Sequence, residues 1–327
     1  MAEVLVTGGA GYVGAHACQA LAAAGHSPTV YDDLSRGHRD AVRWGPLIEG
    51  DVRDAAGLTA ALRQSSAQAI LHFAARAEVG ESVADPMLYY DVNVGGAVAI
   101  ARAAQAAGVD ALIFSSTCAV YGMPARIPID ETAPFQPINP YGASKMMAER
   151  VFADAGQAFG LRTTALRYFN AAGADPEARI GERHDPETHL IPLALRAALP
   201  GDFSLKIMGE DYPTPDGSAV RDYVHVLDLA SAHVRALERL LDGQPGGAFN
   251  LGVGRGFSVK EVTAAVERVS GLTVRRTSAP RRAGDPPELI AAPAAAMTQL
   301  GWRPARTDLD LIVADALRWE ERLRQMA

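Results

Sequence analysis

Tyr141 and Lys145 stand four residues apart in the segment INPYGASKMMAER, which covers residues 138–150 and reads as the start of a helix. Side chains at positions i and i+4 share one face of a helix, so the phenol and the ammonium can meet. A free tyrosine has a pKa of about 10 and is a poor base, but a nearby ammonium is expected to lower that pKa. The pair is therefore a candidate for removing a proton from a hydroxyl group, although the same spacing also occurs in simple surface contacts.

Hydroxyl groups precede this pair in the chain. The run LIFSSTCAVYG reads as a buried strand whose end carries Ser115, Ser116 and Thr117. Ligands of parallel α/β sheets bind beyond the carboxyl ends of the strands. We therefore expect these hydroxyls and Tyr141 to face one substrate.

A glycine-rich turn near the N-terminus predicts a phosphate site. The run VLVTGGAGYVG places Gly8, Gly9, Gly11 and Gly14 between the first expected strand and the first expected helix. Glycine permits a tight turn, a close approach of the backbone to a pyrophosphate and close packing of the helix on the strand. The N–H groups that open the helix would then face the anion.

An acidic residue follows at the distance expected of a dinucleotide site. The second expected strand ends in VYDD, which places Asp32 eighteen residues after Gly14. A carboxylate there binds the ribose diol of NAD and disfavours the 2′-phosphate of NADP. NAD is therefore the expected cofactor, while Arg36 and Arg39 leave NADP as the alternative. The positive ring of oxidised NAD would also favour a phenolate, which suits removal of a proton from a carbinol while its hydride goes to NAD.

Short β-rich runs alternate with alanine-rich segments up to residue 170. Strands are expected at EVLVTG, SPTVYD, AILHFA, ALIFSS and TTALRYFN, and helices up to about residue 24, near 54–64, near 91–107 and over about 140–159. This alternation predicts a doubly wound parallel sheet, the Rossmann type of α/β fold. The chain then becomes polar and irregular before further helices at 190–199, 226–241 and about 308–325, which predicts a smaller mixed α/β domain.

The composition excludes several classes of protein. The 327 residues carry a net charge of -7 and no long basic run, which argues against nucleic acid or an anionic membrane as partner. No apolar run approaches the roughly 18 residues that span a bilayer. The two cysteines, Cys18 and Cys118, form neither a disulfide framework nor a metal-ligand spacing. We expect a soluble cytoplasmic protein.

The histidines give no sign of a metal site. His184, His189, His225 and His233 show no ligand spacing and no grouping with carboxylates in the sequence. Zinc sites usually show such a pattern. No bound metal is therefore expected.

Segments along nearly the whole chain resemble one family. They are GGAGYVG, HFAARAEVGES, YYDVNV, FSSTCAVYG, NPYGASK, RYFNAAGA, DYPTPDGSAVRDYVHV, FNLGVG and RRAGDPPE. Through them the sequence resembles the extended short-chain dehydrogenases/reductases and, among these, the UDP-glucose 4-epimerase family. The VRDYVHV and RRAGD runs are the more discriminating ones.

The resemblance implies a role for each site residue. Tyr141 would be the catalytic base, Lys145 its electrostatic partner, and Thr117 the hydroxyl on the reacting sugar oxygen, where many members carry serine. Threonine keeps the donor and the acceptor. The implied NAD-binding residues are Gly8, Gly11, Tyr12, Val13, Gly14, Asp32, Asp51, Val52, Phe73, Ala74, Asn93, Lys145 and Phe169. The implied UDP-sugar-binding residues are Thr117, Asn170, Leu190, Arg221, Arg282, Asp285 and Leu289. Two arginines suit a diphosphate.

The resemblance also implies a reaction and an architecture. Tightly held NAD would oxidise C4 of the hexose, the 4-keto sugar would turn about its diphosphate, and the hydride would return to the opposite face, which interconverts UDP-galactose and UDP-glucose. Residues 1–170 with about 222–250 would form the NAD-binding domain, and about 171–221 with 251–327 the UDP-sugar-binding domain. A homodimer built from the helices near 91–107 and 140–159 is implied as well.

Three positions depart from the family pattern. Ala77, beside Arg76, stands where members often have a lysine, so the contact to the cofactor phosphate stays open. His189 stands where some members have asparagine, which leaves one contact to UDP open. Leu289 is intermediate between the tyrosine and the cysteine of other members, so acceptance of N-acetylated sugars stays open too.

The same residues argue against some other activities of the superfamily and leave others open. Sugar-nucleotide 4,6-dehydratases and UDP-glucuronate decarboxylases need acidic groups near the strand-end hydroxyl, where this chain has Cys118 and Ala119. A regulator without catalysis would usually have lost Tyr141 or Lys145. A 4-epimerase of UDP-pentoses such as UDP-xylose or UDP-arabinose, and another NAD-dependent UDP-sugar dehydrogenase, stay open.

Overall fold

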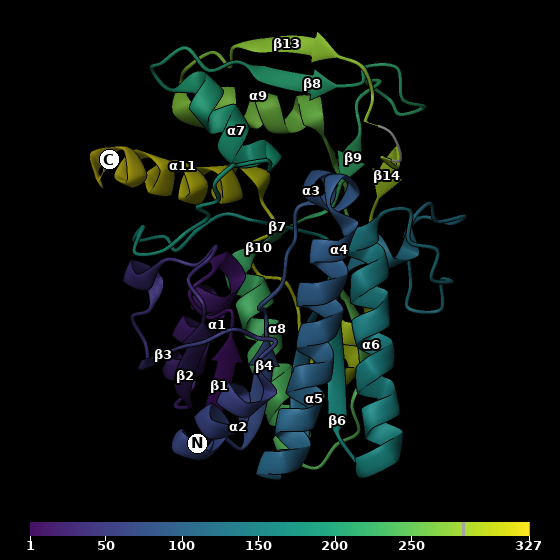
Figure 1. Cartoon of the computed structure of the whole chain (residues 1–327). Coiled ribbons are helices and arrows are strands. Elements are labelled where there is room, and N and C mark those ends of the chain that lie inside the picture. Colours follow the sequence, from purple (N-terminus) through teal and green to yellow (C-terminus); the bar gives the residue numbers. More distant parts are fainter. Residues whose placement is uncertain (283–284, 327) are drawn as a thin grey trace.

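The central feature is a sheet of seven parallel strands, seen in the lower part of the molecule in Figure 1. The computed structural model describes residues 1–282 and 285–326. Across the sheet the strand order is β11-β6-β5-β4-β1-β2-β3. The strands are β1 (Glu3–Thr7), β2 (Ser27–Asp32), β3 (Leu47–Glu49), β4 (Ala69–His72), β5 (Ala111–Thr117), β6 (Arg162–Tyr168) and β11 (Gly247–Leu251).

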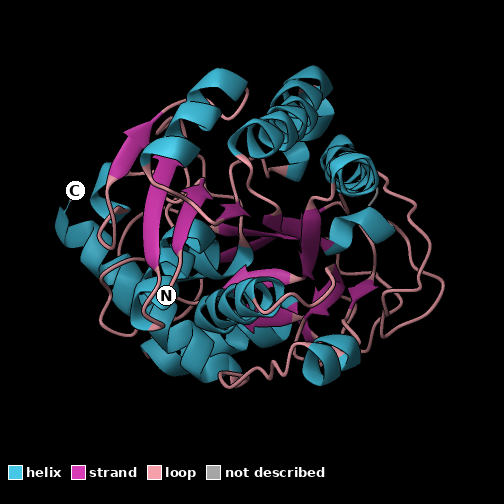
Figure 2. Ribbon diagram, turned by 90° about the horizontal axis from the view of Figure 1, so that it is seen from below, coloured by secondary structure: helices cyan, strands magenta, loops and turns pink. Residues whose placement is uncertain are grey.

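Helices cover both faces of this sheet, as Figure 2 shows from below. On one face α1 (Tyr12–Ala23) and α8 (Val226–Leu241) share a core with β1 and β5. On the other face α2 (Ala55–Gln64), α5 (Gly95–Ala107) and α6 (Pro140–Phe159) close a second core. Every residue of β4 and β5 is buried. Continuous apolar strands without alternation are typical of a parallel sheet covered on both faces.

A smaller assembly of helices and short strands lies above the carboxyl edge of the sheet (Figure 1). Its helices α7 (Leu190–Ala198), α9 (Val259–Ser270) and α11 (Leu309–Met326) share a core of their own. The strands β8 (Leu205–Met208) and β13 (Arg276–Ala279) pair in parallel at the top. A second sheet has the order β12 (Phe257–Ser258), β9 (Val220–Arg221) and β14 (Glu288–Leu289). The pair β7 (Asn170–Ala172) and β10 (Tyr223–His225) lies between the two parts.

Short helices complete the chain around the edge. They are α3 (Val79–Ala84), α4 (Pro86–Tyr89), α10 (Ala294–Gln299) and the single turns at Arg39–Ala41 and Cys118–Tyr121. The helix expected near 91–107 differs in one respect, because Tyr90–Val94 forms a π-helical turn before α5 begins at Gly95. Such turns insert one extra residue and often occur at functional sites. This one carries Asn93, which is buried.

The prediction of a doubly wound α/β fold is confirmed by the strand order and by the helices on both faces. The helix over 140–159 has the predicted bounds.

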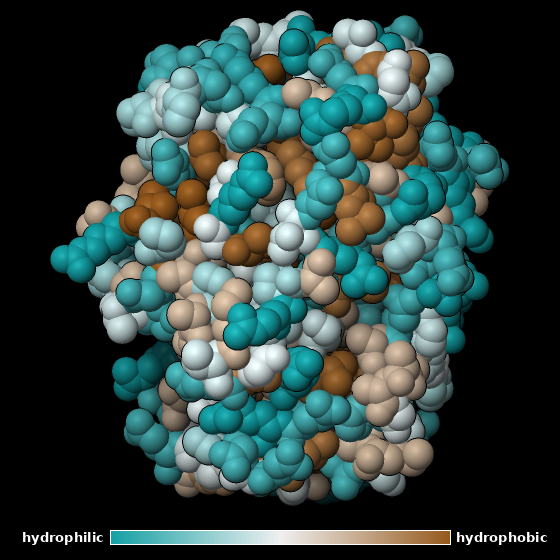
Figure 3. All heavy atoms as spheres, turned by 180° about the vertical axis from the view of Figure 1, so that it is seen from behind, coloured by the Kyte–Doolittle hydropathy of each residue, from teal (hydrophilic) through white to brown (hydrophobic). Residues whose placement is uncertain are grey.

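On the face seen from behind in Figure 3, apolar atoms gather mainly in its upper half and are separated by hydrophilic side chains. Within the described part of the chain, no helix has both the length and the apolar character required for a membrane span.

Candidate active site

The glycine turn joins β1 to α1 at the carboxyl edge of the sheet. Gly8 has a φ of +74°, and a Cβ there would lie 2.4 Å from the backbone nitrogen of Ala74. A Cβ on Gly14 would lie 2.2 Å from the carbonyl oxygen of Gly8. Gly11 is the N-cap of α1, so the first N–H groups of that helix, from Tyr12 on, lack intrahelical partners. The turn thus has the close packing and the helix N-terminus that a pyrophosphate site needs.

Asp32 ends β2 beside this turn, as predicted. One oxygen of its buried carboxylate accepts a hydrogen bond from the N–H of Ala10 at 3.0 Å, and the other accepts from the N–H of Leu34 at 2.9 Å. Burial raises the pKa of Asp32, and these two bonds oppose the rise. Its carboxylate is therefore fixed next to the glycine turn, where a ribose diol would bind. Arg36 and Arg39 pair with Glu81 and Glu49 respectively.

Of four further residues expected at the cofactor, two already have polar partners and one is buried in the core. The Tyr12 hydroxyl donates to the carbonyl of Gly173 at 2.6 Å, and Val13 follows it in the first turn of α1. The Asp51 carboxylate binds the guanidinium of Arg53 at 3.0 and 3.1 Å from Nε, which lowers the pKa of Asp51. Val52 is buried in the core beneath α5. A cofactor would have to share Asp51 with Arg53.

The ends of the neighbouring strands bring more of the predicted residues together. Phe73 and Ala74 follow β4, and both backbone N–H groups donate to the carbonyl of Thr7 in β1. Phe169 follows β6 and is buried in a cluster with Cys118.

The Asn93 amide, on the π-helical turn, accepts from the Arg76 N–H at 2.8 Å and donates to the Arg76 carbonyl at 3.0 Å. It also donates to the hydroxyl of Ser144 in α6 at 2.9 Å. Asn93 therefore fixes the 74–78 segment, in which Ala77 replaces the family's lysine, against α6.

Tyr141 lies in the first turn of α6, whose start is set by local signals. The Asn139 side chain caps the helix by accepting from the N–H of Gly142 at 2.8 Å, and Pro140 occupies the first helical position. A Cβ on Gly142 would lie 2.5 Å from the carbonyl of Ala119, so this turn packs directly against the residues after β5. The packing brings Tyr141 to the end of the strand that carries Thr117.

Lys145 is buried one turn further along α6, with 3% of its surface exposed. Its ammonium donates to the carbonyl of Ser115 at 2.8 Å and lies 4.9 Å from the centre of the Phe114 ring. Burial lowers the pKa of Lys145 to about 7, and the charge of Glu149 opposes that fall. The lysine is thus positioned rigidly beneath the strand-end hydroxyls.

The electrostatics of Tyr141 correct one expectation. Burial raises the pKa of Tyr141 to about 12; a hydrogen bond with the Thr117 side chain opposes the rise, and the charges of Cys118 and Glu78 add to it. Lys145 does not lower this pKa in the protein alone, because its ammonium is directed to the Ser115 carbonyl and loses its own proton more readily. The prediction of a lowered pKa is therefore wrong for the protein by itself. Tyr141 and Thr117 thus lie close to each other, and their roles at a common site stay a prediction.

A buried network behind these residues was missed from the sequence. The Glu149 carboxylate accepts from the Ser116 hydroxyl at 2.5 Å and from two nitrogens of Arg167 at 2.6 and 2.9 Å. Arg167 also donates to the hydroxyl of Tyr121 at 2.9 Å. Glu149 follows Lys145 by four residues on one helix face, which was the available signal. Ser116 therefore faces this network rather than Tyr141.

On the other side of the site, Arg221 lies in β9, the middle strand of the β12-β9-β14 sheet. Phe257 and Leu289 flank it in the register, and its guanidinium pairs with the carboxylate of Asp285. Arg282 is exposed, and its carbonyl accepts from the N–H of Asp285 at 3.3 Å. Residues 283–284 of the RRAGDPPE run lie outside the described residues.

The other residues expected at the substrate come from three places. Asn170 opens β7 beside Tyr223, and Leu190 is the first residue of α7. Leu289 packs against the cluster that contains Cys118 and Phe169. The structure thus places Leu289 near the end of β5, on the same side as Thr117.

The expectation about histidines needs a second correction. His184 and His189 lie beside the carboxylates of Glu182 and Glu187, with nitrogen to oxygen distances of 2.8–3.5 Å. The two glutamates raise the pKa of His184 to about 9. The statement that these histidines have no grouping with carboxylates is therefore wrong, and the grouping was visible in the sequence, because all four residues lie within positions 182–189. His225 instead pairs with the buried carboxylate of Asp315 at 3.0 Å.

The residues at the carboxyl edge fit NAD. The glycine turn leaves no room for side chains at Gly8 and Gly14, and the buried Asp32 carboxylate lies against it. Tyr141 and Lys145 stand at the end of β5, two strands away from β1 in the sheet. A dinucleotide that lies across the ends of these strands would reach both places.

Comparison with known proteins agrees with this geometry. A family model described as the NAD dependent epimerase/dehydratase family matches residues 4–252. The chain is 52% identical over 323 residues to the UDP-glucose 4-epimerase of Rhizobium meliloti (strain 1021), covering 99% of this chain and 98% of that protein.

Solved structures agree as well. The crystal structure of UDP-glucose 4-epimerase from Brucella ovis in complex with NAD has a TM-score of 0.95 at 48% identity, covering 98% of this chain and 99% of that one. The UDP-glucose-4-epimerase from Stenotrophomonas maltophila, with bound NAD and formylated UDP-arabinopyranose, has a TM-score of 0.95 at 39% identity and full coverage of both, 100% and 100%. The chain belongs to the NAD-dependent epimerase/dehydratase family and, within it, to the UDP-glucose 4-epimerase family predicted from its motifs.

Proposed function

We propose that this protein is an NAD-dependent isomerase that interconverts UDP-galactose and UDP-glucose. The observation that carries the proposal is that the first turn of α6, with Tyr141 and the buried Lys145, packs against the end of β5, which carries Thr117, at the same sheet edge as the glycine turn. A base, a hydroxyl and a dinucleotide site in this arrangement suit reversible oxidation of a secondary alcohol. The curated relative at 52% identity carries the same activity in its name.

The residues then have distinct roles. Tyr141 accepts the proton of the C4 hydroxyl and later gives it back, while Thr117 holds the same oxygen by a hydrogen bond. Lys145 keeps the end of β5 in place through the Ser115 carbonyl and, when it is protonated, adds positive charge beneath the site. NAD, when bound, supplies the chemistry of taking the hydride from C4 and returning it to the opposite face. The glycine turn and Asp32 hold its pyrophosphate and ribose.

The UDP group needs a firm grip, because the 4-keto sugar has to turn while the nucleotide stays. Arg221 and Arg282 supply the charge for the diphosphate, and Asp285 orients the guanidinium of Arg221. Asn170 and Leu190 complete the nucleotide side. These assignments predict that Arg221→Met weakens UDP binding and leaves NAD binding unchanged, which calorimetric titration with each nucleotide measures.

A UDP-pentose is the second candidate substrate. The Stenotrophomonas maltophila structure holds a formylated UDP-arabinopyranose, whose sugar is a pentose, and its fold matches this chain with a TM-score of 0.95. Leu289 packs near the end of β5 and is a residue of intermediate size at the sugar side. Turnover of UDP-galactose, UDP-xylose and UDP-N-acetylgalactosamine measured in parallel would rank these substrates.

We also propose a homodimer through α5 and α6. An open groove between these helices is lined by apolar side chains that include Val94, Val98 and Met147. Met147 is 39% exposed. A second copy that covers this groove would bury the apolar surface, as a two-fold interface does. Sedimentation of the wild-type protein and of Val98→Glu tests the proposal, since the charge is expected to shift the protein to monomers.

The central experiment is to incubate the purified holoenzyme with UDP-galactose and follow UDP-glucose without added reductant. The expected result is conversion with no net release of NADH. Tyr141→Phe should lose nearly all turnover and still bind UDP. The matched control is Tyr168→Phe, which removes the neighbouring phenol that contacts Ser115 and should retain most of the turnover.

Three results would overturn the proposal. They are the absence of UDP-glucose from UDP-galactose, stoichiometric or continuous NADH release, which would mark a dehydrogenase, and full turnover in Tyr141→Phe. Conversion of UDP-xylose alone would reject the hexose as substrate and keep the assigned base.

A further inference from the structure

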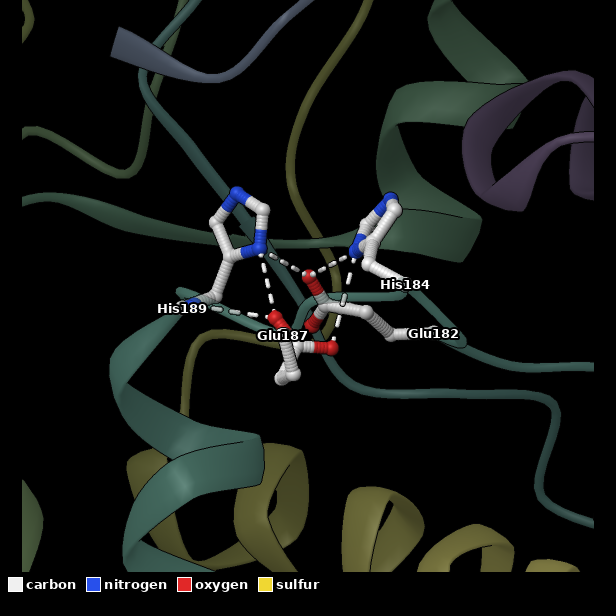
Figure 4. Close-up of side chains that lie close together, drawn as sticks. All are labelled: Glu182, His184, Glu187 and His189. Carbon is white, nitrogen blue, oxygen red and sulfur yellow. Dashed lines mark hydrogen bonds and ion pairs between the residues drawn. The ribbon is translucent and has the colours of Figure 1, made fainter. Parts of the chain in front are cut away.

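Glu182, His184 and Glu187, which have no role in the proposed reaction, meet His189, whose contact to UDP is open, in the loop between β7 and α7. We call Glu182, His184, Glu187 and His189 the His-Glu cluster (Figure 4). One ligand atom from each lies within 4.8 Å of the others. Figure 4 shows that a ring nitrogen of each histidine points toward both carboxylates, so the four groups converge on one region.

The distances within the His-Glu cluster match the edges of a small coordination polyhedron. His189 Nδ1 lies 2.8 Å from a Glu182 oxygen and 2.9 Å from a Glu187 oxygen. His184 Nδ1 lies 3.4 Å and 3.5 Å from the same two carboxylates. A tetrahedral zinc site with bonds of about 2.0–2.1 Å has edges of roughly 3.3 Å between its ligands. The four observed contacts lie on both sides of that value, although they involve both oxygens of Glu187, and ligand atoms that lie up to 4.8 Å apart would have to move closer around an ion.

Two buried atoms of the cluster lack a well-aligned hydrogen bond, which a cluster held together by protons alone would be expected to form. His184 Nδ1 and Glu187 Oε2 are buried and meet each other only in a long ion pair of 3.5 Å, without a hydrogen bond of good geometry. The Glu187 side chain is only 1% exposed, and that of Glu182 is 6% exposed. Buried polar atoms are nearly always paired, so each unpaired one needs an explanation. A cation between the two groups would provide the missing partner for both.

Contacts from other elements hold the backbone of this loop in place. The indole of Trp319 in α11 donates to the Glu182 carbonyl at 2.7 Å, and a ring nitrogen of His38 lies 3.0 Å from the Arg183 carbonyl. At the other end the Thr188 hydroxyl donates to Glu78. The ligand atoms are therefore presented on a backbone that is fixed at several points, which favours metal binding over a flexible acidic loop.

We propose that the His-Glu cluster binds one divalent transition-metal ion, with Zn²⁺ as the fitting species, through two imidazole nitrogens and two carboxylate oxygens. Mixed nitrogen and oxygen ligands suit Zn²⁺, whereas Mg²⁺ and Ca²⁺ prefer oxygen alone. The ion balances the charges of Glu182 and Glu187 and ties the loop to the start of α7, whose first residue is Leu190. The ion has a structural role here, and the proposal does not depend on the substrate.

The test uses the full chain without an affinity tag, treated with a chelator and then dialysed. Calorimetric titration with Zn²⁺ alone should reveal one saturable site per chain, and Co²⁺ alone should give the intense visible absorption of a tetrahedral complex. Zn²⁺ should also raise the melting temperature of the wild-type protein, because an ion that binds only the folded state stabilises it.

Variants connect the binding to the His-Glu cluster. His184→Gln and Glu187→Gln should lose the site and the Zn²⁺-dependent rise in melting temperature. His26→Gln is the matched control, because His26 also faces a glutamate, Glu238 at 3.7 Å, but outside the His-Glu cluster. This control should bind Zn²⁺ like the wild type.

The wild-type titration decides the matter even if a variant fails to fold. No saturable site for Zn²⁺ or Co²⁺ in the wild type would overturn the proposal and leave the cluster as two imidazolium–carboxylate pairs. Equal binding by the wild type and a folded His184→Gln variant would overturn it too, since the metal would then sit elsewhere.

Discussion

Replacing Lys145 by methionine is expected to stabilise the protein while it removes activity. Only 3% of the surface of Lys145 is exposed, and this burial lowers the pKa of its ammonium from 10.5 to about 7. Methionine has a similar length and no charge to desolvate. The native state of the variant therefore avoids the cost of a buried ammonium, whereas the proposed reaction loses its cation.

The size of the effect follows from the change in proton affinity. Each pKa unit corresponds to about 1.4 kcal/mol, so the fall from 10.5 to about 7 corresponds to about 5 kcal/mol, of which about 4 kcal/mol is felt at pH 7. Methionine also loses the hydrogen bond to the Ser115 carbonyl, which costs about 1 kcal/mol. The variant should thus gain about 3 kcal/mol in free energy of unfolding at pH 7.

The stability difference between Lys145→Met and the wild type should also change with pH in a defined direction. Because the pKa of Lys145 is lower in the folded state, its contribution to stability is complete above pH 10.5 and is lost as the pH falls toward about 7. The advantage of Lys145→Met should accordingly shrink to about 1 kcal/mol at pH 9. Urea unfolding of nucleotide-free protein at pH 7 and pH 9 measures both values.

Lys206→Met is the control, because the Lys206 side chain is exposed on β8. Its unfolding free energy should differ from that of the wild type by less than about 0.5 kcal/mol at both pH values. The reasoning is refuted if the difference between Lys145→Met and the wild type is equal at pH 7 and pH 9. It is refuted as well if the wild type is the more stable protein at pH 7.

The remaining predictions concern the cofactor side. Gly14→Ala places a Cβ 2.2 Å from the Gly8 carbonyl, so NAD titration should show at least about a tenfold loss of affinity, whereas Gly80→Ala, with no atom within 4 Å, should bind NAD normally. Asn93→Ala leaves the N–H and the carbonyl of Arg76 without their partner and should lower the free energy of unfolding in urea by about 1–3 kcal/mol. Unchanged stability of Asn93→Ala would contradict the role assigned to its amide.

Much of the fold was predictable because its signals are local. The start of α6 at Pro140 follows from the cap at Asn139, and its end follows from Gly160, which adopts the left-handed conformation at φ +81°. The position of Asp32 at the end of a strand was predictable, because this strand of six residues has five that are buried. Each of these features depends on neighbours in the sequence, so a single chain is enough to find them.

Two features were missed, one between distant residues and one within a single loop. The Glu149–Arg167 pair joins α6 to β6, and nothing near either residue predicts the other. Glu182 and Glu187 meet the two histidines only because the loop between β7 and α7 folds back on itself and is held from outside by α11. The four residues lie within eight positions of the chain, so their grouping was visible in the sequence, but which of their atoms meet depends on how the loop folds. Burial, which sets the proton affinities at the site, depends on the fold as well.

Burial changes the protonation expected for both Tyr141 and Lys145. The protein alone raises the pKa of Tyr141 to about 12 and lowers that of Lys145 to about 7, so both side chains tend toward their neutral forms. Thr117 opposes this for the phenol but does not reverse it. A phenolate therefore requires positive charge brought close to Tyr141, and oxidised NAD carries such a charge on its nicotinamide ring. With NAD bound, its positive ring would favour loss of the proton from the Tyr141 hydroxyl, so the base would be charged when a hydride acceptor is in place.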